Sequence, residues 1–172
     1  MMKPTTRVCF DMLVGKKIQF ILYLAFFIPA INYAEENGDK FEHFYLQAGT
    51  YKHYQSNDDY AGPDIFIALE AIKPDCRLYG LALFDNSFGQ FSQYLYTGKV
   101  WNYHGGLEGF HTKLTVGLLH GYKGEFQDKI PFNHYGIAPA IVPGAGYKNG
   151  RFGADVFMLG LSGLLFTVGM DL

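Results

Sequence analysis

Residues 162–172, SGLLFTVGMDL, decide the fold of this chain. Large apolar side chains stand at every second position from Leu164 to Leu172, and Leu, Thr, Gly and Asp stand between them. A period of two is typical of a β-strand with one apolar face, because successive side chains point to opposite faces of a sheet. The segment therefore predicts a strand that runs to the last residue.

The same alternation recurs upstream, and almost no segment shows the 3.6-residue period of a helix. Between the alternating segments lie turn residues. Lys148-Asn149-Gly150, for example, predicts a two-residue hairpin, because Asn-Gly tolerates the positive φ of a type I′ turn. The pattern predicts an all-β fold with eight strands, over 43–53, 63–72, 77–85, 90–101, 109–122, 136–147, 151–159 and 162–172.

The first 34 residues have the pattern of a secretory signal peptide. Basic residues from Lys3 to Lys17 come before an apolar run from Ile18 to Ile31, and the small residue Ala34 follows. A transmembrane anchor is the alternative, but the run is about 14 residues long and a spanning helix needs about 20. We therefore expect a signal peptide over 1–34 and one domain over 35–172, in which Cys76 is the single cysteine.

Composition excludes several classes of function. The 172 residues carry 14 Lys and Arg against 16 Asp and Glu, so no basic surface argues for nucleic acid. Phosphate-binding loops, nucleotide fingerprints and zinc-ligand spacings are missing from the sequence, and we expect no cofactor and no metal. Charged residues make up only 17%, below the roughly 25% of ordinary globular proteins.

An even number of strands of about 9 to 11 residues, each with one apolar face, is the signature of an outer-membrane β-barrel. Such a sheet can cross lipid only when it closes, because every backbone polar group must be paired there. The alternative is a soluble lipocalin-like barrel, whose apolar face turns inward. We favour a monomeric, eight-stranded antiparallel transmembrane barrel in the bacterial outer membrane, with membrane lipids as its partners.

Two further sets of residues predict what lies at the ends of the strands and inside this barrel. Aromatic residues near strand ends predict interfacial girdles: Tyr45, Tyr51, Tyr79, Tyr94, Tyr96, Trp101, Phe110, Tyr122 and Tyr147. Small residues predict space inside for one slim ligand such as an acyl chain, and not for a water-filled pore: Gly80, Ala82, Gly98, Gly117, Gly153 and Gly169.

Three segments carry a family resemblance. Residues 45–53 read YLQAGTYKH, residues 82–91 read ALFDNSFGQF, and residues 137–147 read IAPAIVPGAGY. Together they resemble the lipid A palmitoyltransferase (PagP) family of small outer-membrane barrels. The resemblance implies transfer of an acyl chain from a phospholipid to lipid A, and it places a catalytic site at His53, Asp85 and Ser87.

The sequence departs from the family pattern at the site. With the serines aligned at Ser87, the family's aspartate falls on Asn86, and Asp85 is displaced by one residue. The family's histidine falls on Lys52 or on His53, depending on the direction of alignment. The amphipathic helix that precedes the family's barrel is missing too. A noncatalytic barrel, structural or binding a hydrophobic ligand, is therefore the alternative function.

Acyl transfer needs a hydroxyl activated by a general base, or a histidine and a carboxylate that deprotonate an acceptor hydroxyl. Counting strands from a periplasmic N-terminus puts His53 and Ser87 at the same extracellular rim. Prolines inside strands remove ladder donors, so Pro63, Pro139 and Pro143 predict a lateral gate for a lipid chain. The alternative is that Pro139 ends a loop and Pro143 makes a bulge.

Overall fold

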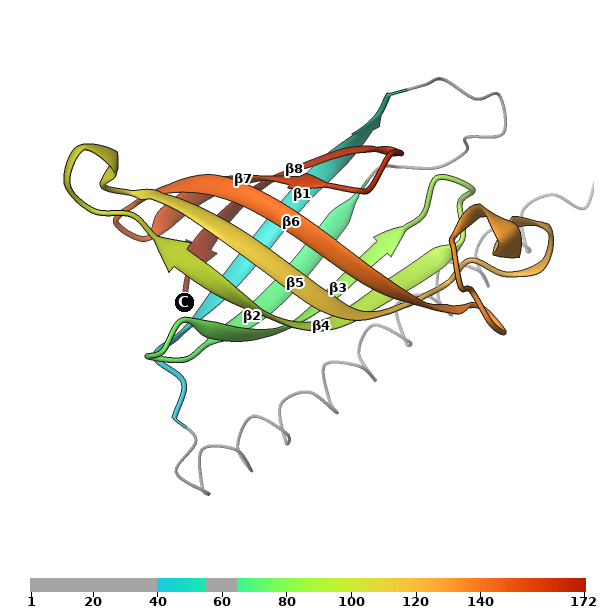
Figure 1. The fold of residues 1–172 in the computed structure, drawn as a ribbon, viewed down its shortest axis with the longest axis horizontal. Coiled ribbons are helices and arrows are strands. Elements are labelled where there is room, and N and C mark those ends of the chain that lie inside the picture. Colours follow the sequence, from blue (N-terminus) through green and yellow to red (C-terminus); the bar gives the residue numbers. More distant parts are fainter. Residues whose placement is uncertain (1–39, 55–64) are drawn as a thin grey trace, which may run out of the picture. The chain divides into compact units, whose positions relative to one another are not determined.

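The computed structural model describes residues 40–54 and 65–172 (Figure 1). The predicted signal peptide and Pro63 lie outside these residues. Eight antiparallel strands form a closed barrel in sequence order, and β1 pairs with β8. The strands are β1 (His43–His53), β2 (Phe66–Ile72), β3 (Arg77–Asp85), β4 (Phe91–Asn102), β5 (Phe110–His120), β6 (Ile137–Asn149), β7 (Phe152–Met158) and β8 (Gly163–Asp171).

Two short 3-10 helices lie in connections: η1 (Gly105–Leu107) between β4 and β5, and η2 (Gly124–Lys129) between β5 and β6. No helix among the described residues is long and apolar enough to cross a bilayer. The predicted all-β fold with eight strands is confirmed, and β1 and β3 have the predicted bounds.

The hairpin between β6 and β7 differs from its prediction. Asn149 pairs with Phe152, so the two central residues are Gly150 and Arg151. Gly150 has a φ of 59°, and neither Asn149 nor Arg151 has a positive φ. A glycine at the first central position is typical of a type II′ turn. The type I′ prediction was wrong because β6 extends two residues beyond its predicted end.

Apolar side chains cover most of the outside of the barrel, and a set of buried charges lies inside. The exposed fractions of Leu118 and Ile141 are 56% and 67%, whereas those of Glu70 and Asp155 are 1% and 2%. A soluble lipocalin-like barrel requires the reverse arrangement, with its apolar face turned inward. The exposed apolar band includes Leu46, Ile67, Leu95, Leu114, Val116, Leu118, Ile141, Val156, Val168 and Met170.

The aromatic residues divide between the two surfaces. Tyr79, Trp101, Phe110 and Tyr147 are exposed near the end of the barrel that holds the chain's C-terminus. Tyr45, Tyr51, Tyr94 and Tyr96 are buried inside, so their assignment to girdles was wrong. The physical reason is strand parity: each of these four lies on the inward positions of its strand.

The glycines inside the barrel make room for these tyrosine rings. A Cβ on Gly80 would lie 2.3 Å from the Tyr96 ring, and one on Gly169 would lie 2.5 Å from the ring of Tyr45. The space that the small residues were expected to leave for a ligand is therefore filled by side chains near Gly80 and Gly169.

Candidate functional site

A serine and a histidine meet at the rim opposite the C-terminus. The Ser87 hydroxyl lies 2.8 Å from His53 Nε2. Ser87 follows β3 in a tight turn, and His53 is the last residue of β1, on its inward positions. The structure thus brings together two of the three predicted catalytic residues. Lys52, the alternative position for the histidine, lies on the exposed face of β1.

The second nitrogen of His53 contacts a main-chain carbonyl, and this contact selects the tautomer of the ring. His53 Nδ1 lies 3.2 Å from the carbonyl oxygen of Ser162, in the turn between β7 and β8. A carbonyl oxygen only accepts, so Nδ1 carries the hydrogen, and in this tautomer Nε2 accepts from Ser87. The Tyr51 ring packs edge-on against the imidazole with 5.2 Å between centroids. A nucleophile, a base and a group that orients the base are therefore all present.

Asp85, the third predicted catalytic residue, ends β3 at the same rim. Its main-chain carbonyl accepts a hydrogen bond from the Tyr51 hydroxyl at 3.1 Å. Inward positions of β3 are those of Leu78, Gly80 and Ala82, so alternation assigns the Asp85 side chain to the outward face. The contact that orients His53 Nδ1 comes from the Ser162 carbonyl. No side-chain pattern signals a main-chain acceptor, so sequence reasoning missed it.

Asn86 continues the inward alternation of β3 and is buried. Its Oδ1 accepts hydrogen bonds from the backbone N–H groups of Phe88 and Gln90, both at 3.0 Å. These two bonds orient the amide so that Nδ2 is the free end. Nδ2 is buried and has no hydrogen-bond partner among the described residues. A desolvated donor without a partner costs about 1–3 kcal/mol, and here it lies one residue from Ser87.

The turn that carries Ser87 is held by the loop between β5 and β6. Phe88 stacks on Phe126 of η2 with ring centroids 4.1 Å apart. The Gln90 side chain accepts from Lys123 N at 3.0 Å and donates to Lys123 O at 3.2 Å. These contacts fix the backbone beside Ser87 from a second loop.

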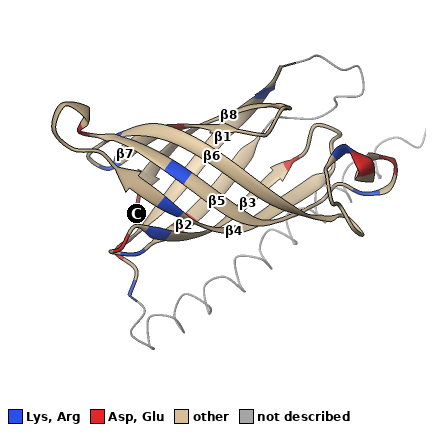
Figure 2. Ribbon diagram, viewed as in Figure 1, with Lys and Arg blue, Asp and Glu red and all other residues tan. Residues whose placement is uncertain are grey.

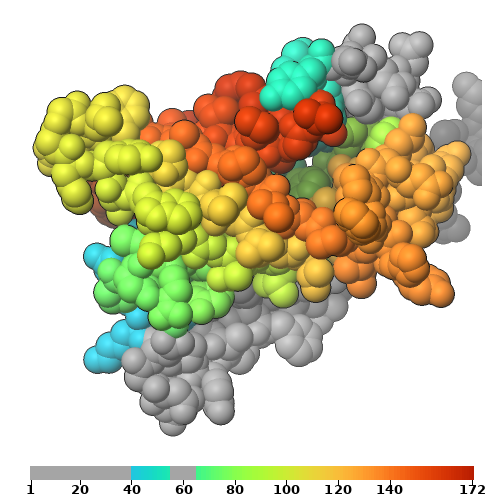
Figure 3. All heavy atoms as spheres, in the orientation of Figure 1, coloured from blue at the N-terminus to red at the C-terminus, as the bar shows by residue number. Residues whose placement is uncertain are grey.

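The wall of the barrel is incomplete beside β6. Pairing of β6 with β7 runs from Asn149 to Gly144 and stops there, so residues 137–143 have no β7 partner. In Figure 3 the surface is hollowed between the red residues near the β7–β8 turn and the orange residues of β6 and its preceding loop. Pro139 and Pro143 both lie in this stretch, inside a strand that pairs with β5. Pro139 therefore does not end a loop.

The backbone hydrogen-bond pattern of β6 shows which neighbouring strand each proline nitrogen faces. Lys148 N donates to Gly109 O, so even-numbered residues of β6 bond to β5 and odd-numbered residues face the β7 side. Pro143 stands at the next bonding position after the last β6–β7 pair, and it has no N–H to donate. The ladder stops where this proline lies opposite Met158, the last residue of β7.

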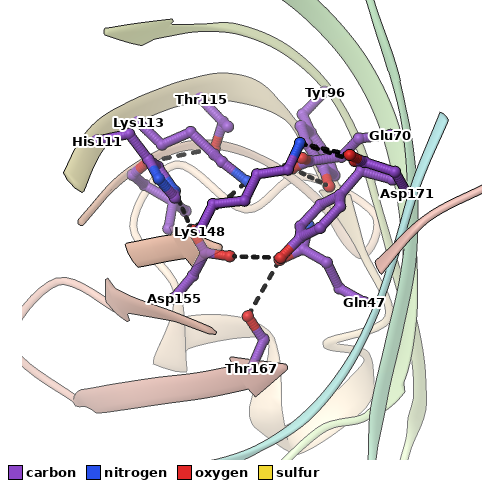
Figure 4. A network of polar contacts seen from close by, with 12 residues as sticks. Gln47, Glu70, Tyr96, His111, Lys113, Thr115, Lys148, Asp155, Thr167 and Asp171 are labelled. Atoms are coloured by element: carbon purple, nitrogen blue, oxygen red, sulfur yellow. Dashed lines mark hydrogen bonds and ion pairs between the residues drawn. The ribbon is translucent and has the colours of Figure 1, made fainter. Parts of the chain in front are cut away.

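A network of charges fills the other end of the lumen (Figure 4). Lys113 Nζ lies 2.9 Å from Glu70 Oε2 and 3.7 Å from Asp155 Oδ1. His111 Nε2 lies 2.6 Å from the same Asp155 oxygen. Tyr96 donates to Glu70 at 3.1 Å, and Thr167 donates to Gln47 at 3.0 Å. The sequence signal for this network is the presence of the charged residues Glu70, Lys113 and Asp155 within alternating strands. Sequence reasoning did not use this signal.

A cavity of about 250 Å³ opens at this same end, lined among others by Tyr45, His111, Lys113 and Lys148. None of the lining residues belongs to the His53–Ser87 pair, so this cavity is separate from the candidate site. Among residues 40–54 and 65–172, no group of three or more His, Cys, Asp or Glu side chains is arranged to hold a metal ion.

Comparison with known proteins finds no protein-family model and no curated protein that matches this chain.

Proposed function

We propose that this protein spans the bacterial outer membrane after removal of its signal peptide and transfers an acyl chain from a phospholipid to lipid A. The observation that carries the proposal is the hydrogen bond between Ser87 and His53 Nε2, with His53 oriented through Nδ1. The apolar exterior and the buried charges support insertion in lipid, where outward-facing residues contact acyl chains.

The proposed reaction begins with attack of Ser87 Oγ on the ester carbonyl of the phospholipid. The new C–O bond forms as the hydroxyl proton passes to His53 Nε2, and the carbonyl π electrons move to oxygen. The tetrahedral centre then expels the lysophospholipid oxygen, which takes the proton from His53. A lipid A hydroxyl reverses these steps: it gives its proton to Nε2 and takes the acyl group, and Ser87 Oγ leaves and recovers that proton.

Asn86 supplies the remaining group that this chemistry needs. Negative charge develops on the carbonyl oxygen in the transition state, and a fixed, desolvated donor stabilises it more than water does. The buried Nδ2 of Asn86 is such a donor, held by two backbone hydrogen bonds to its Oδ1. The unpaired edge of β6 gives the lipid chain a route from the bilayer into the lumen.

Mass spectra of lipid A from cells expressing each variant test the proposal. Ser87→Ala and His53→Ala should each remove the added acyl chain, because a general base contributes about 10²- to 10⁴-fold. Ser162→Ala is the matched control, since its carbonyl, and not its hydroxyl, contacts His53. Heat-modifiable migration on gels checks that each barrel is folded. An unchanged lipid A spectrum with wild-type protein would favour the noncatalytic barrel.

A further inference from the structure

Two cations face each other on the outer surface of the barrel. Arg77 of β3 and Lys99 of β4 are cross-strand partners, and both lie on the outward face. Like charges directly opposite each other destabilise a sheet unless a counter-charge lies near. Figure 2 shows the blue segments of these neighbouring strands side by side, at the end where β3 begins.

A third cation and a set of aromatic rings surround this pair. The Lys73 ammonium lies over the outward-facing Tyr79 ring, 5.2 Å from its centroid. Trp101 is exposed two positions beyond Lys99 on the same face of β4. Leu114, the cross-strand partner of Lys99 on β5, belongs to the exposed apolar band. The cation patch is defined as the exposed Arg77 and Lys99 together with the buried Lys73, and it lies at the border of that band.

The two exposed cations of the patch, Arg77 and Lys99, differ in their carboxylate partners. Arg77 Nε pairs with Asp75 Oδ2 at 2.5 Å. Desolvation raises the pKa of Asp75, but hydrogen bonds from the backbone and side chain of Arg77 outweigh it and hold that pKa below its ordinary value. Asp75 is therefore ionised at neutral pH. Lys99 has no carboxylate partner in the described part of the chain.

We propose that the cation patch binds the headgroup of an anionic phospholipid. This inference rests on the membrane insertion proposed above, and not on the acyl transfer. Aromatic side chains such as Trp101 mark the headgroup level of a membrane-spanning protein, and Arg77 and Lys99 stand beside them. With the N-terminus in the periplasm, the end of the barrel where β3 begins faces the inner leaflet of the outer membrane. The lipid phosphate supplies the counter-charge for Lys99, whose cross-strand neighbour Arg77 already pairs with Asp75.

The single tryptophan of the chain, Trp101, reports directly on this patch. The full mature protein is reconstituted in phosphatidylcholine vesicles that contain a fixed fraction of one brominated lipid, either phosphatidylglycerol or phosphatidylcholine. Bromine on the acyl chains quenches tryptophan fluorescence on contact. Preferential quenching by brominated phosphatidylglycerol is the expected result, and its ratio to quenching by brominated phosphatidylcholine gives the relative affinity.

Charge-neutral variants identify the source of the preference. Each Lys or Arg near a membrane surface contributes about fivefold to the binding of anionic lipid. Lys99→Gln should therefore lower the preference about fivefold, and Arg77→Gln should lower it less because Asp75 already offsets that charge. Lys129→Gln in η2, near the opposite rim, makes the same charge change and should leave the preference unaltered.

The outcomes separate the two proposals. Equal quenching by the two brominated lipids in the wild-type protein would overturn the headgroup site while leaving membrane insertion in place. Trp101 fluorescence that neither brominated lipid quenches would overturn membrane insertion itself. An equal loss of preference in Lys99→Gln and Lys129→Gln would show that overall charge, and not this patch, attracts the lipid, and it would also overturn the site.

Discussion

Ser87 Oγ and His53 Nε2 lie 2.8 Å apart, although 34 residues separate them in the chain. Strands β1 and β3 both end at the same rim, and β2 lies between them in the barrel. The contact therefore spans the width of one intervening strand. The tight turn after Asp85 places the Ser87 side chain within hydrogen-bond distance of His53.

Membrane insertion predicts a strong response at the middle of β5. Val116 is an outward-facing residue with cross-strand partners Thr97 and Ile141. Val116→Arg should lower the free energy of unfolding in phospholipid vesicles by about 2–4 kcal/mol, the cost of arginine near the bilayer midplane. Val116→Leu is the control and should change it little. Urea titration monitored by tryptophan fluorescence measures both. A change within about 0.5 kcal/mol for Val116→Arg would fit a water-exposed surface instead.

The donor role of Asn86 is tested by a nearly isosteric change. Asn86→Asp keeps an oxygen to accept from Phe88 N and Gln90 N, and it removes the Nδ2 donor. We expect kcat for acyl transfer to fall about 10²- to 10³-fold with KM little changed, as on losing one oxyanion donor. A variant as active as the wild type or more so would show that this position works as a carboxylate, as the alignment with the family's aspartate implies.

The two prolines of β6 should respond differently to replacement. Pro143→Ala adds an N–H at the next bonding position toward β7, and we expect a stability gain of about 0.5–1.5 kcal/mol with slower acylation as the edge closes. Pro139→Ala adds a donor where no β7 residue lies opposite, so it should form no ladder bond. Urea unfolding and lipid A spectra measure these effects. Equal gains from the two changes would contradict an open edge along 137–143.

The buried charges of the lumen should behave as a coupled unit. Lys113→Met leaves Glu70 and Asp155 without their shared cation, and Glu70→Gln leaves Lys113 with the more distant Asp155. Breaking a buried ion pair from one side costs about 3–5 kcal/mol. The double variant should lose clearly less free energy of unfolding than the two single variants lose in sum. Strict additivity in a double-mutant cycle would show that Lys113 and Glu70 do not interact.

The strands could be predicted because their signals are local. The alternation around Leu114 and Leu164, and turn residues such as Gly150, are each visible within about ten residues. Strand bounds consequently differ from the prediction by only a few positions, as in β6, which ends at Asn149. Which face of each strand turns toward the lumen is not a local signal. That choice places Tyr45, Tyr51, Tyr94 and Tyr96 inside the barrel.

The site was predictable only in part. Ser87 and His53 follow from their places at strand ends, because antiparallel order puts those ends at one rim. The Ser162 carbonyl and the buried Nδ2 of Asn86 depend on backbone geometry that no residue pattern reports. The ion pair of Lys113 with Glu70 joins strands 43 residues apart, and its partners become neighbours only when the barrel closes.

The seam between the first and last strands governs how the barrel forms. Residues 45–53 pair with residues 163–171, and the Thr167–Gln47 hydrogen bond joins positions 120 residues apart. Until this seam closes, any partial sheet has two edges of unpaired backbone groups, and under the proposed membrane insertion these edges could not lie in lipid. The entropy lost on closing so long a loop grows only slowly with its length, but contacts this distant in sequence make folding slow. Formation of the barrel is therefore cooperative, with the meeting of the chain's two ends as the step that completes it.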